Sequence, residues 1–100
     1  MAYLLIIKEP ALEDTRNAYK YYEDITPGLG DRFLAQLHAA YTSISQYPES
    51  FAFIDDKKIL RDKLLKVFPF TIIYTIEKNV VVVIAVHNCY QHPGKRYRNR

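Results

Sequence analysis

Apolar residues in the first part of the chain recur with a helical period. A short apolar run at residues 3–8 (YLLIIK) is typical of a strand, and Pro10 suits the opening of a helix after it. Four apolar residues then follow at spacings of seven, four and three: Ala11, Ala18, Tyr22 and Ile25. This spacing predicts one apolar face of a helix over residues 11–26. Glu13 and Asp14 would lie in its first turn, where the helix dipole favours anions.

A second helical stripe follows the turn-prone stretch TPGLG at residues 26–30. Its apolar positions are Phe33, Leu37, Ala40, Ile44 and Tyr47, with Leu34 and Tyr41 beside them. Pro48 ends the pattern, which predicts a helix over residues 30–47 with Asp31 or a neighbour as its cap. Because the connection is so short, the two helices must return as an antiparallel hairpin.

After about residue 50 the pattern changes to strands. Residues 59–67 mix apolar and basic side chains, and residues 70–76 (FTIIYTI) are β-branched and aromatic. Beyond a tight turn at residues 77–79, the run VVVVIAV at residues 80–86 predicts a central strand that is buried on both faces. The order is β-α-α-β-β-β. It predicts an α+β fold, with a helical hairpin packed on a small, largely antiparallel sheet.

Length and composition restrict the class of protein. A chain of 100 residues has room for one domain, which we assign to residues 1–100. Its one cysteine, Cys89, excludes an internal disulfide and a cysteine-based metal site. No apolar run approaches the roughly 20 residues that span a bilayer, and the N-terminus lacks the features of a signal peptide. We therefore expect a cytoplasmic protein with no membrane partner, no metal and no cofactor.

The charge of the chain is unevenly distributed. Residues 1–52 carry 4 basic and 7 acidic side chains, whereas residues 53–100 carry 10 basic and 4 acidic ones. The second half is therefore the candidate surface for a polyanion. The alternative is an ordinary basic surface that keeps a small protein in solution. The last six residues contain four cations, Lys95, Arg96, Arg98 and Arg100.

Four stretches, in order along nearly the whole chain, carry a family resemblance. They are YYE at 21–23 with PGLGDRF at 27–33, Ile44–Pro48 with Phe51, Arg61 with FPF at 68–70 and Ile73-Tyr74, and IAVH at 84–87. With them the chain resembles the RelE/ParE superfamily of bacterial toxins from type II toxin–antitoxin systems. The resemblance implies this same fold, a toxic activity and a cognate antitoxin that neutralises it.

Most of these motifs have an explanation in the fold. Pro27 and the two glycines after it suit a compact turn between helices, because glycine permits positive φ. Proline before a strand is tolerated at its entry. We expect Tyr21, Tyr22 and Tyr74 to be core and hydrogen-bonding tyrosines.

The resemblance leaves the target open. ParE-like members bind DNA gyrase and poison it, whereas RelE-like members cut mRNA on the ribosome. We favour the ParE-like binder, because the PGLG turn and the FPF strand entry resemble that branch. The alternatives are a ribosome-dependent mRNA endoribonuclease that works without a metal, and a degenerate member that binds a partner without toxicity.

The candidate site residues follow from these two activities. RNA cleavage needs an acid and a base near the ribose and a cation at the phosphate, for which the candidates are Arg61, His87 and Tyr90. Binding of a polyanion or a protein target needs cations and exposed rings. The candidates for that role are Lys63, Lys66, Lys95, Arg96, Tyr97, Arg98 and Arg100.

The nuclease signature of the family is altered in this chain. Many members end the last strand with a histidine, followed three residues later by an arginine and two residues after that by a proline. Measured back from Pro93, those positions hold Asn88 and Gln91. His87 is one residue away, which in a strand points its side chain to the other face. We therefore expect the C-terminal stretch to bind rather than to catalyse.

Overall fold

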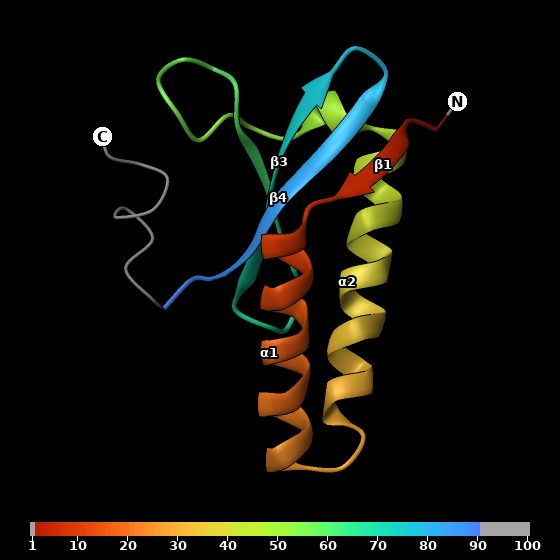
Figure 1. Cartoon of the computed structure of the whole chain (residues 1–100), viewed down its shortest axis with the longest axis vertical. Helices are drawn as coiled ribbons and strands as arrows, with labels where there is room; N and C mark the ends of the chain where they lie inside the picture. The colour runs from red at the N-terminus through yellow and green to blue at the C-terminus, as the bar shows by residue number, and fades with distance from the viewer. Residues whose placement is uncertain (1, 91–100) are drawn as a thin grey trace.

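The computed structural model describes residues 2–90, and the element order is β-α-α-β-β-β. The elements are β1 (Leu4–Ile7), α1 (Glu9–Ile25), α2 (Leu29–Gln46), a short 3₁₀ helix η1 (Pro48–Ser50), β2 (Arg61–Leu64), β3 (Phe70–Glu77) and β4 (Val80–Asn88). Figure 1 shows the two helices side by side against one face of the sheet, with their hairpin extending past its end. The predicted α+β fold is confirmed.

The four strands form one mixed sheet in the order β1-β4-β3-β2. β1 runs parallel to β4, and the other two pairings are antiparallel. The valine-rich strand β4 is therefore central, as predicted. It continues to Asn88, beyond the predicted end at residue 86.

β4 contains one more residue than the stretch of β3 opposite it. Tyr74 lies opposite Val83, and Ile73 lies opposite Ala85, so Ile84 has no partner on β3. Such a β-bulge interrupts the alternation of side chains between the two faces of a sheet.

The bulge determines which side chains of β4 face the helices. Val83 and Val86 both belong to the core under the helices, although they are three residues apart. Side chains alternate again beyond the bulge. Asn88 therefore points to the helical side, and His87 points to the opposite face.

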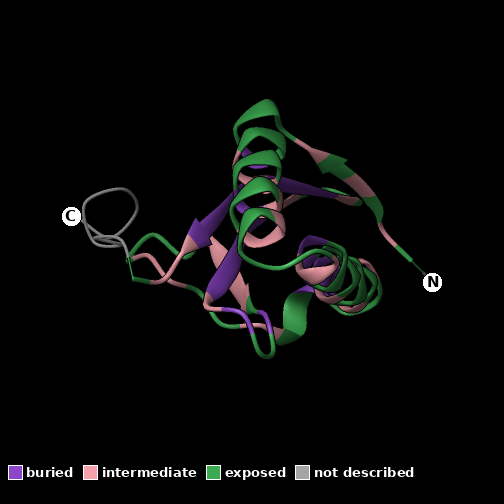
Figure 2. Cartoon of the chain, turned by 90° about the horizontal axis from the view of Figure 1, so that it is seen from below, coloured by how far each residue is buried: buried purple, intermediate pink, exposed green. Residues whose placement is uncertain are grey.

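The core lies between the helices and the sheet, where Figure 2 shows the buried strands. At one end of this core the rings of Tyr22, Phe33, Phe68 and Phe70 pack with centroid separations of 4.9 to 6.2 Å. Most of these pairs are edge-to-face, an arrangement that aromatic rings favour. They join both helices to the turn that precedes β3.

The predicted helical stripes are confirmed except at the C-terminal end of each stripe. Phe33, Leu37, Ala40 and Ile44 are buried. Ile25 is exposed because the end of α1 extends past the sheet (Figure 1). Tyr47 is also exposed, because it lies just beyond the last residue of α2.

Of the three tyrosines expected in the core, Tyr74 is fully buried. Its hydroxyl donates to the backbone carbonyl of Pro48 at 2.6 Å, which ties β3 to η1. Burial raises the pKa of Tyr74 to about 12, so the hydroxyl remains a donor at neutral pH. The prediction was wrong for Tyr21, which is 62% exposed.

The sheet face away from the helices is also largely buried. Its side chains include Ile73, Ala85 and His87. The Thr75 hydroxyl on this face donates to the Ile59 carbonyl at 2.8 Å, so the loop before β2 contacts it. Burial on both sides explains why polar residues are so rare along β4.

The turn between the helices is closed by Glu23. The backbone N–H groups of Gly28 and Gly30 donate to its two carboxylate oxygens at 2.9 and 2.8 Å. These donors at the start of a helix otherwise have no partner within it. The expectation that Asp31 or a neighbour caps α2 was wrong, because a residue of α1 folds back to do so.

The two glycines of this turn serve different purposes. Gly28 has a φ of 92°, which glycine adopts without strain. A Cβ at Gly30 would lie 2.7 Å from both a Glu23 carboxylate oxygen and the ring of Tyr19. Only glycine leaves room there for the capping carboxylate, so this motif is a device of the fold.

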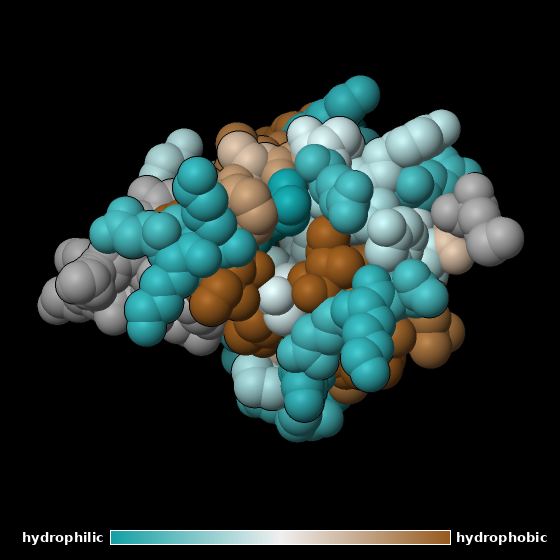
Figure 3. All heavy atoms as spheres, turned by 90° about the horizontal axis from the view of Figure 1, so that it is seen from above, coloured by the Kyte–Doolittle hydropathy of each residue, from teal (hydrophilic) through white to brown (hydrophobic). Residues whose placement is uncertain are grey.

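Three broader features bear on function. No helix within residues 2–90 is long and apolar enough to cross a membrane. The same residues hold no group of three or more histidine, cysteine or acidic side chains suited to a metal. Seen from above, apolar residues reach the surface in several places between hydrophilic side chains (Figure 3).

Replacing Glu23 by Ala is expected to lower the free energy of unfolding by about 2 kcal/mol, because two helix-start N–H groups lose their acceptor. Chemical denaturation measures this change. Asp24→Ala is the matched control, because the neighbouring Asp24 is exposed, and it is expected to change stability by less than about 0.5 kcal/mol. Equal effects of the two substitutions would contradict the capping role.

Candidate partner-binding groove

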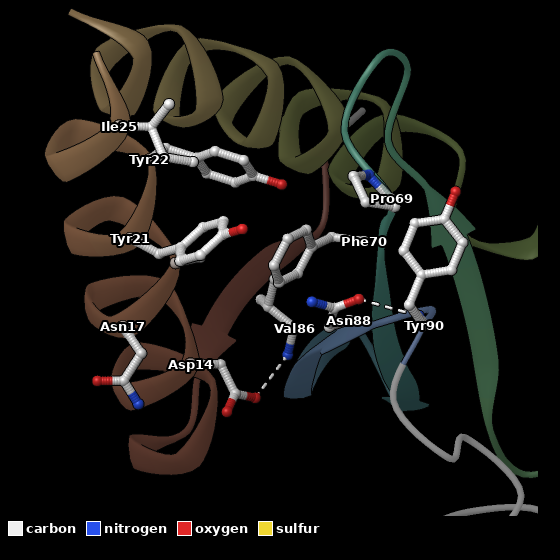
Figure 4. Close-up of a pocket in the computed structure, with 11 residues that line it drawn as sticks. Asp14, Asn17, Tyr21, Tyr22, Ile25, Pro69, Phe70, Val86, Asn88 and Tyr90 are labelled. Atoms are coloured by element: carbon white, nitrogen blue, oxygen red, sulfur yellow. Dashed lines mark hydrogen bonds between the residues drawn. The ribbon is translucent and has the colours of Figure 1, made fainter. Parts of the chain in front are cut away.

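A groove with a volume of about 600 Å³ opens between α1 and the neighbouring ends of β3 and β4. We refer to it as the α1–β4 groove. It is lined by Asp14, Asn17, Ala18, Tyr21, Tyr22, Ile25, Pro69, Phe70, Val86, Asn88 and Tyr90. Figure 4 shows tyrosine rings from α1 reaching toward Phe70 and Pro69 across the groove.

Aromatic rings form the apolar part of the groove. Tyr21 and Tyr22 contact each other edge-to-face at 5.2 Å, and Tyr22 packs on Phe68 at 4.9 Å. Burial raises the pKa of Tyr22, which keeps its hydroxyl protonated. One wall is thus anchored in the core, while Tyr21 remains free to contact a partner.

The polar part of the groove lies along an open edge of β4. β1 ends at Ile7, which pairs with Val83, so no described strand flanks β4 on that side beyond this point. The backbone N–H of Val86 donates instead to the Asp14 carboxylate at 3.0 Å. Side chains that cover a strand edge prevent unwanted pairing with other chains.

The same carboxylate corrects an expectation about α1. The helix begins at Glu9, so Glu9 rather than Glu13 or Asp14 lies in the first turn. Asp14 instead sits one turn further on, where it reaches the sheet. Its partner is a strand N–H rather than the helix dipole.

Asn88 and Tyr90 lie at the rim of the groove. The Tyr90 N–H donates to the side-chain oxygen of Asn88 at 2.9 Å, as Figure 4 shows. The Tyr90 side chain is 85% exposed. It is therefore placed to contact a partner, as Tyr21 is.

Arg61, the first catalytic candidate, supports the segment before β2. Its Nη1 donates to the carbonyls of Glu49 and Phe51 at 3.1 and 2.7 Å. Its guanidinium also lies 3.9 Å from the ring centroid of Phe53, a cation–π contact. These contacts hold the chain between η1 and β2 in place.

The other catalytic candidates lie elsewhere. Arg61 pairs with Tyr74, whereas His87 pairs with Thr71. Thr71 lies three residues before Tyr74 in β3, a separation of roughly 10 Å along the strand. Arg61 shares its face with Tyr74, on the helical side, whereas His87 is buried on the opposite face. The structure does not bring Arg61, His87 and Tyr90 together.

The candidates for target binding fall in two groups. Lys63 lies 5.2 Å from the ring of Phe51 and, like the exposed Lys66, borders a shallow depression beside α2. Five further candidates lie outside the described residues: Lys95, Arg96, Tyr97, Arg98 and Arg100.

Comparison with known proteins decides the family. The model of the family described as "ParE toxin of type II toxin-antitoxin system, parDE" matches residues 5–91. The chain belongs to the ParE toxin family.

Solved structures agree with this assignment at the level of the fold. A chain of the structure titled "Chromosomal ParDE TA system from P. aeruginosa" is similar, with a TM-score of 0.77 and 12% identity. The likeness covers 87% of this chain and 96% of that chain. A search of curated proteins gave no match.

Sequence reasoning missed the groove of this ParE toxin. Asp14 and Asn17 are ordinary polar residues of a helix surface, and Tyr21 was expected in the core. A signal for the groove was present in Ile25 and Tyr21, two large apolar side chains near the end of a helix. Their exposure depends on how far α1 extends past the sheet, which the helical period does not specify.

Arg61→Ala is expected to lower the free energy of unfolding by about 2 kcal/mol, because two carbonyls lose a charged donor. Denaturation in urea measures this change. Lys63→Ala, which removes a neighbouring cation on the same face of β2, is expected to have a smaller effect. An Arg61→Ala protein of wild-type stability would show that the carbonyl contacts contribute little.

Proposed function

We propose that this ParE toxin acts by binding DNA gyrase and inhibiting it, and that it does not cut RNA. The separation of Arg61 and His87 on opposite faces of the sheet carries this proposal. Metal-free RNA cleavage needs its acid, base and cation around a single phosphate. A buried His87 and an Arg61 engaged with two carbonyls do not supply such a set.

The basic half of the chain supplies the target surface in this proposal. Lys63 and Lys66 lie on one side of the sheet beside α2. The cations Lys95, Arg96, Arg98 and Arg100, with Tyr97, add charge and a ring from the C-terminal stretch. Such charges increase the rate of association with an acidic partner and make it sensitive to salt.

ParE toxins pair with a ParD antitoxin, and we place the docking of the cognate antitoxin in the α1–β4 groove. The groove combines exposed rings with a strand edge that no described strand pairs beyond Val83, which suits an extended or helical segment of a partner. Apolar side chains of that segment would lie between Tyr21 and Phe70. Its backbone would run beside Val86, where Asp14 now covers the edge.

Both proposed partners belong to the bacterial cytoplasm, so we propose that the toxin acts there as well. No cofactor is required for either interaction. The antitoxin neutralises the toxin either by covering the target surface or by holding it away from gyrase.

Purified toxin is expected to inhibit DNA supercoiling by gyrase, and addition of the antitoxin is expected to restore it. Deleting Lys95–Arg100 is expected to weaken the inhibition and to reduce its sensitivity to salt, since four cations are removed. Purified ribosomes translating a defined mRNA provide the parallel assay. Cleavage of that mRNA, with gyrase unaffected, would replace the proposal by the endoribonuclease alternative.

Ile25→Lys is expected to weaken the toxin–antitoxin complex at least about tenfold, because it places a charge in the apolar part of the groove. Isothermal titration calorimetry measures the affinity. Leu12→Lys is the matched control, because Leu12 is a partly exposed apolar residue of α1 that does not line the groove. An unchanged affinity for the Ile25 variant would place the antitoxin elsewhere.

A further inference from the structure

In the turn between β2 and β3, a valine has a backbone conformation that valine rarely adopts. Val67 has a φ of 60°, in the left-handed region. The N–H of Phe68 donates to the carbonyl of Lys66, which encloses Val67 in a three-residue turn. A three-residue turn with positive φ at its centre is the rare, strained kind. For a β-branched residue, positive φ is an outlier.

The surrounding structure explains why the chain turns at this point, but it does not explain why the residue in the turn is a valine. Leu65 and Phe68 are buried on either side and fix the path of the chain. The ring of Phe68 packs on Tyr22 at 4.9 Å and on Phe33 at 5.5 Å. Glycine would adopt the same conformation without strain. Val67 itself is 80% exposed, so its side chain gains little from burial.

Two other non-glycine residues among those described have positive φ, and they differ from Val67 in kind. Lys58 and Lys78 both have a φ of 58°. Each is an unbranched residue in an exposed turn, and positive φ is less unfavourable for an unbranched side chain than for a β-branched one. Val67 is both branched and apolar, so it incurs backbone strain and exposes apolar surface together. Strained residues of this sort cluster at binding sites.

The surroundings of Val67 indicate what a partner would need. The cation Lys66 directly precedes Val67. Leu64, three residues before Val67, is also an exposed apolar residue, with 59% of its surface accessible. A small apolar side chain on an anchored turn suits insertion into a preformed pocket of a folded protein, because little flexibility is lost on binding. A flexible antitoxin segment instead supplies its own side chains to a groove.

We propose that Val67 is a contact residue for the protein target of the toxin, and that it inserts into a shallow apolar pocket of that target with an acidic group near Lys66. This inference rests on the proposed function, in which the target is a folded protein. It adds a specific apolar contact to the basic surface described above. The proposed antitoxin groove is a separate surface, because neither Lys66 nor Val67 lines it. The groove begins with the residues that follow the turn, Pro69 and Phe70.

The test compares Val67→Gly with Lys78→Gly, which changes a residue of nearly the same φ in the turn between β3 and β4. In both variants glycine removes the backbone strain of a positive φ, so both are expected to keep or raise the midpoint of thermal unfolding. Val67→Gly is expected to lower gyrase inhibition about tenfold, whereas Lys78→Gly retains it. Val67→Ile keeps a branched apolar side chain and is expected to retain inhibition. Antitoxin affinity is expected to be the same in all of these proteins.

Growth arrest on controlled expression provides a readout that does not depend on the identity of the target. Val67→Gly toxin at the wild-type protein level is expected to arrest growth less than the wild type and Lys78→Gly do. Equal arrest by the two glycine variants overturns the inference, as does a wild-type chain that causes no arrest. A wild type that arrests growth without affecting gyrase refutes the proposed function alone.

Discussion

One extra residue in the central strand determines which side chains of β4 face the helices and the α1–β4 groove. Successive side chains of a strand point to opposite faces of the sheet, and both faces of β4 are buried. The bulge at Ile84 reverses those directions for the last part of the strand. Val86 therefore continues the core under the helices, Asn88 reaches the groove, and His87 is buried on the far side. Without the bulge, His87 would point toward α1.

The remaining features of the groove follow from the short first strand. Because β1 ends at Ile7, β4 has an open edge beyond Val83, and α1 passes beside that edge. Asp14 accepts the N–H of Val86 there. The exposed end of α1 adds Tyr21 and Ile25. A concave surface of rings and strand edge results, which is suited to a peptide segment.

The turn before β3 provides a surface of the opposite shape. Its convex tip is fixed by Leu65 and Phe68 in the core and exposes Val67. In our account the groove receives the antitoxin and the tip enters the target. The same aromatic cluster, through Tyr22 and Phe68, supports both surfaces. The burial that stabilises the fold therefore also fixes the relative positions of the two.

The fold could be predicted from the sequence because the apolar positions that show a helical or strand period are the same positions that become buried. The apolar stripe from Phe33 to Ile44 and the valine run of β4 are buried over most of their length. The spacing of their apolar residues predicts this burial. The site was harder to predict, because it depends on where elements end and on register. The cap of α2 by Glu23 and the edge contact of Asp14 join residues whose proximity no local pattern specifies. The bulge at Ile84 is likewise invisible in an unbroken apolar run.

We propose that the toxin acts by binding a protein and not by cutting RNA. Expression in bacteria, followed by parallel mapping of chromosomal DNA breaks and of mRNA 5′ ends, distinguishes these two modes of action. Our account predicts DNA breaks that appear before growth stops, while mRNA ends remain as in uninduced cells. New mRNA ends within translated codons, with the chromosome intact, would contradict it.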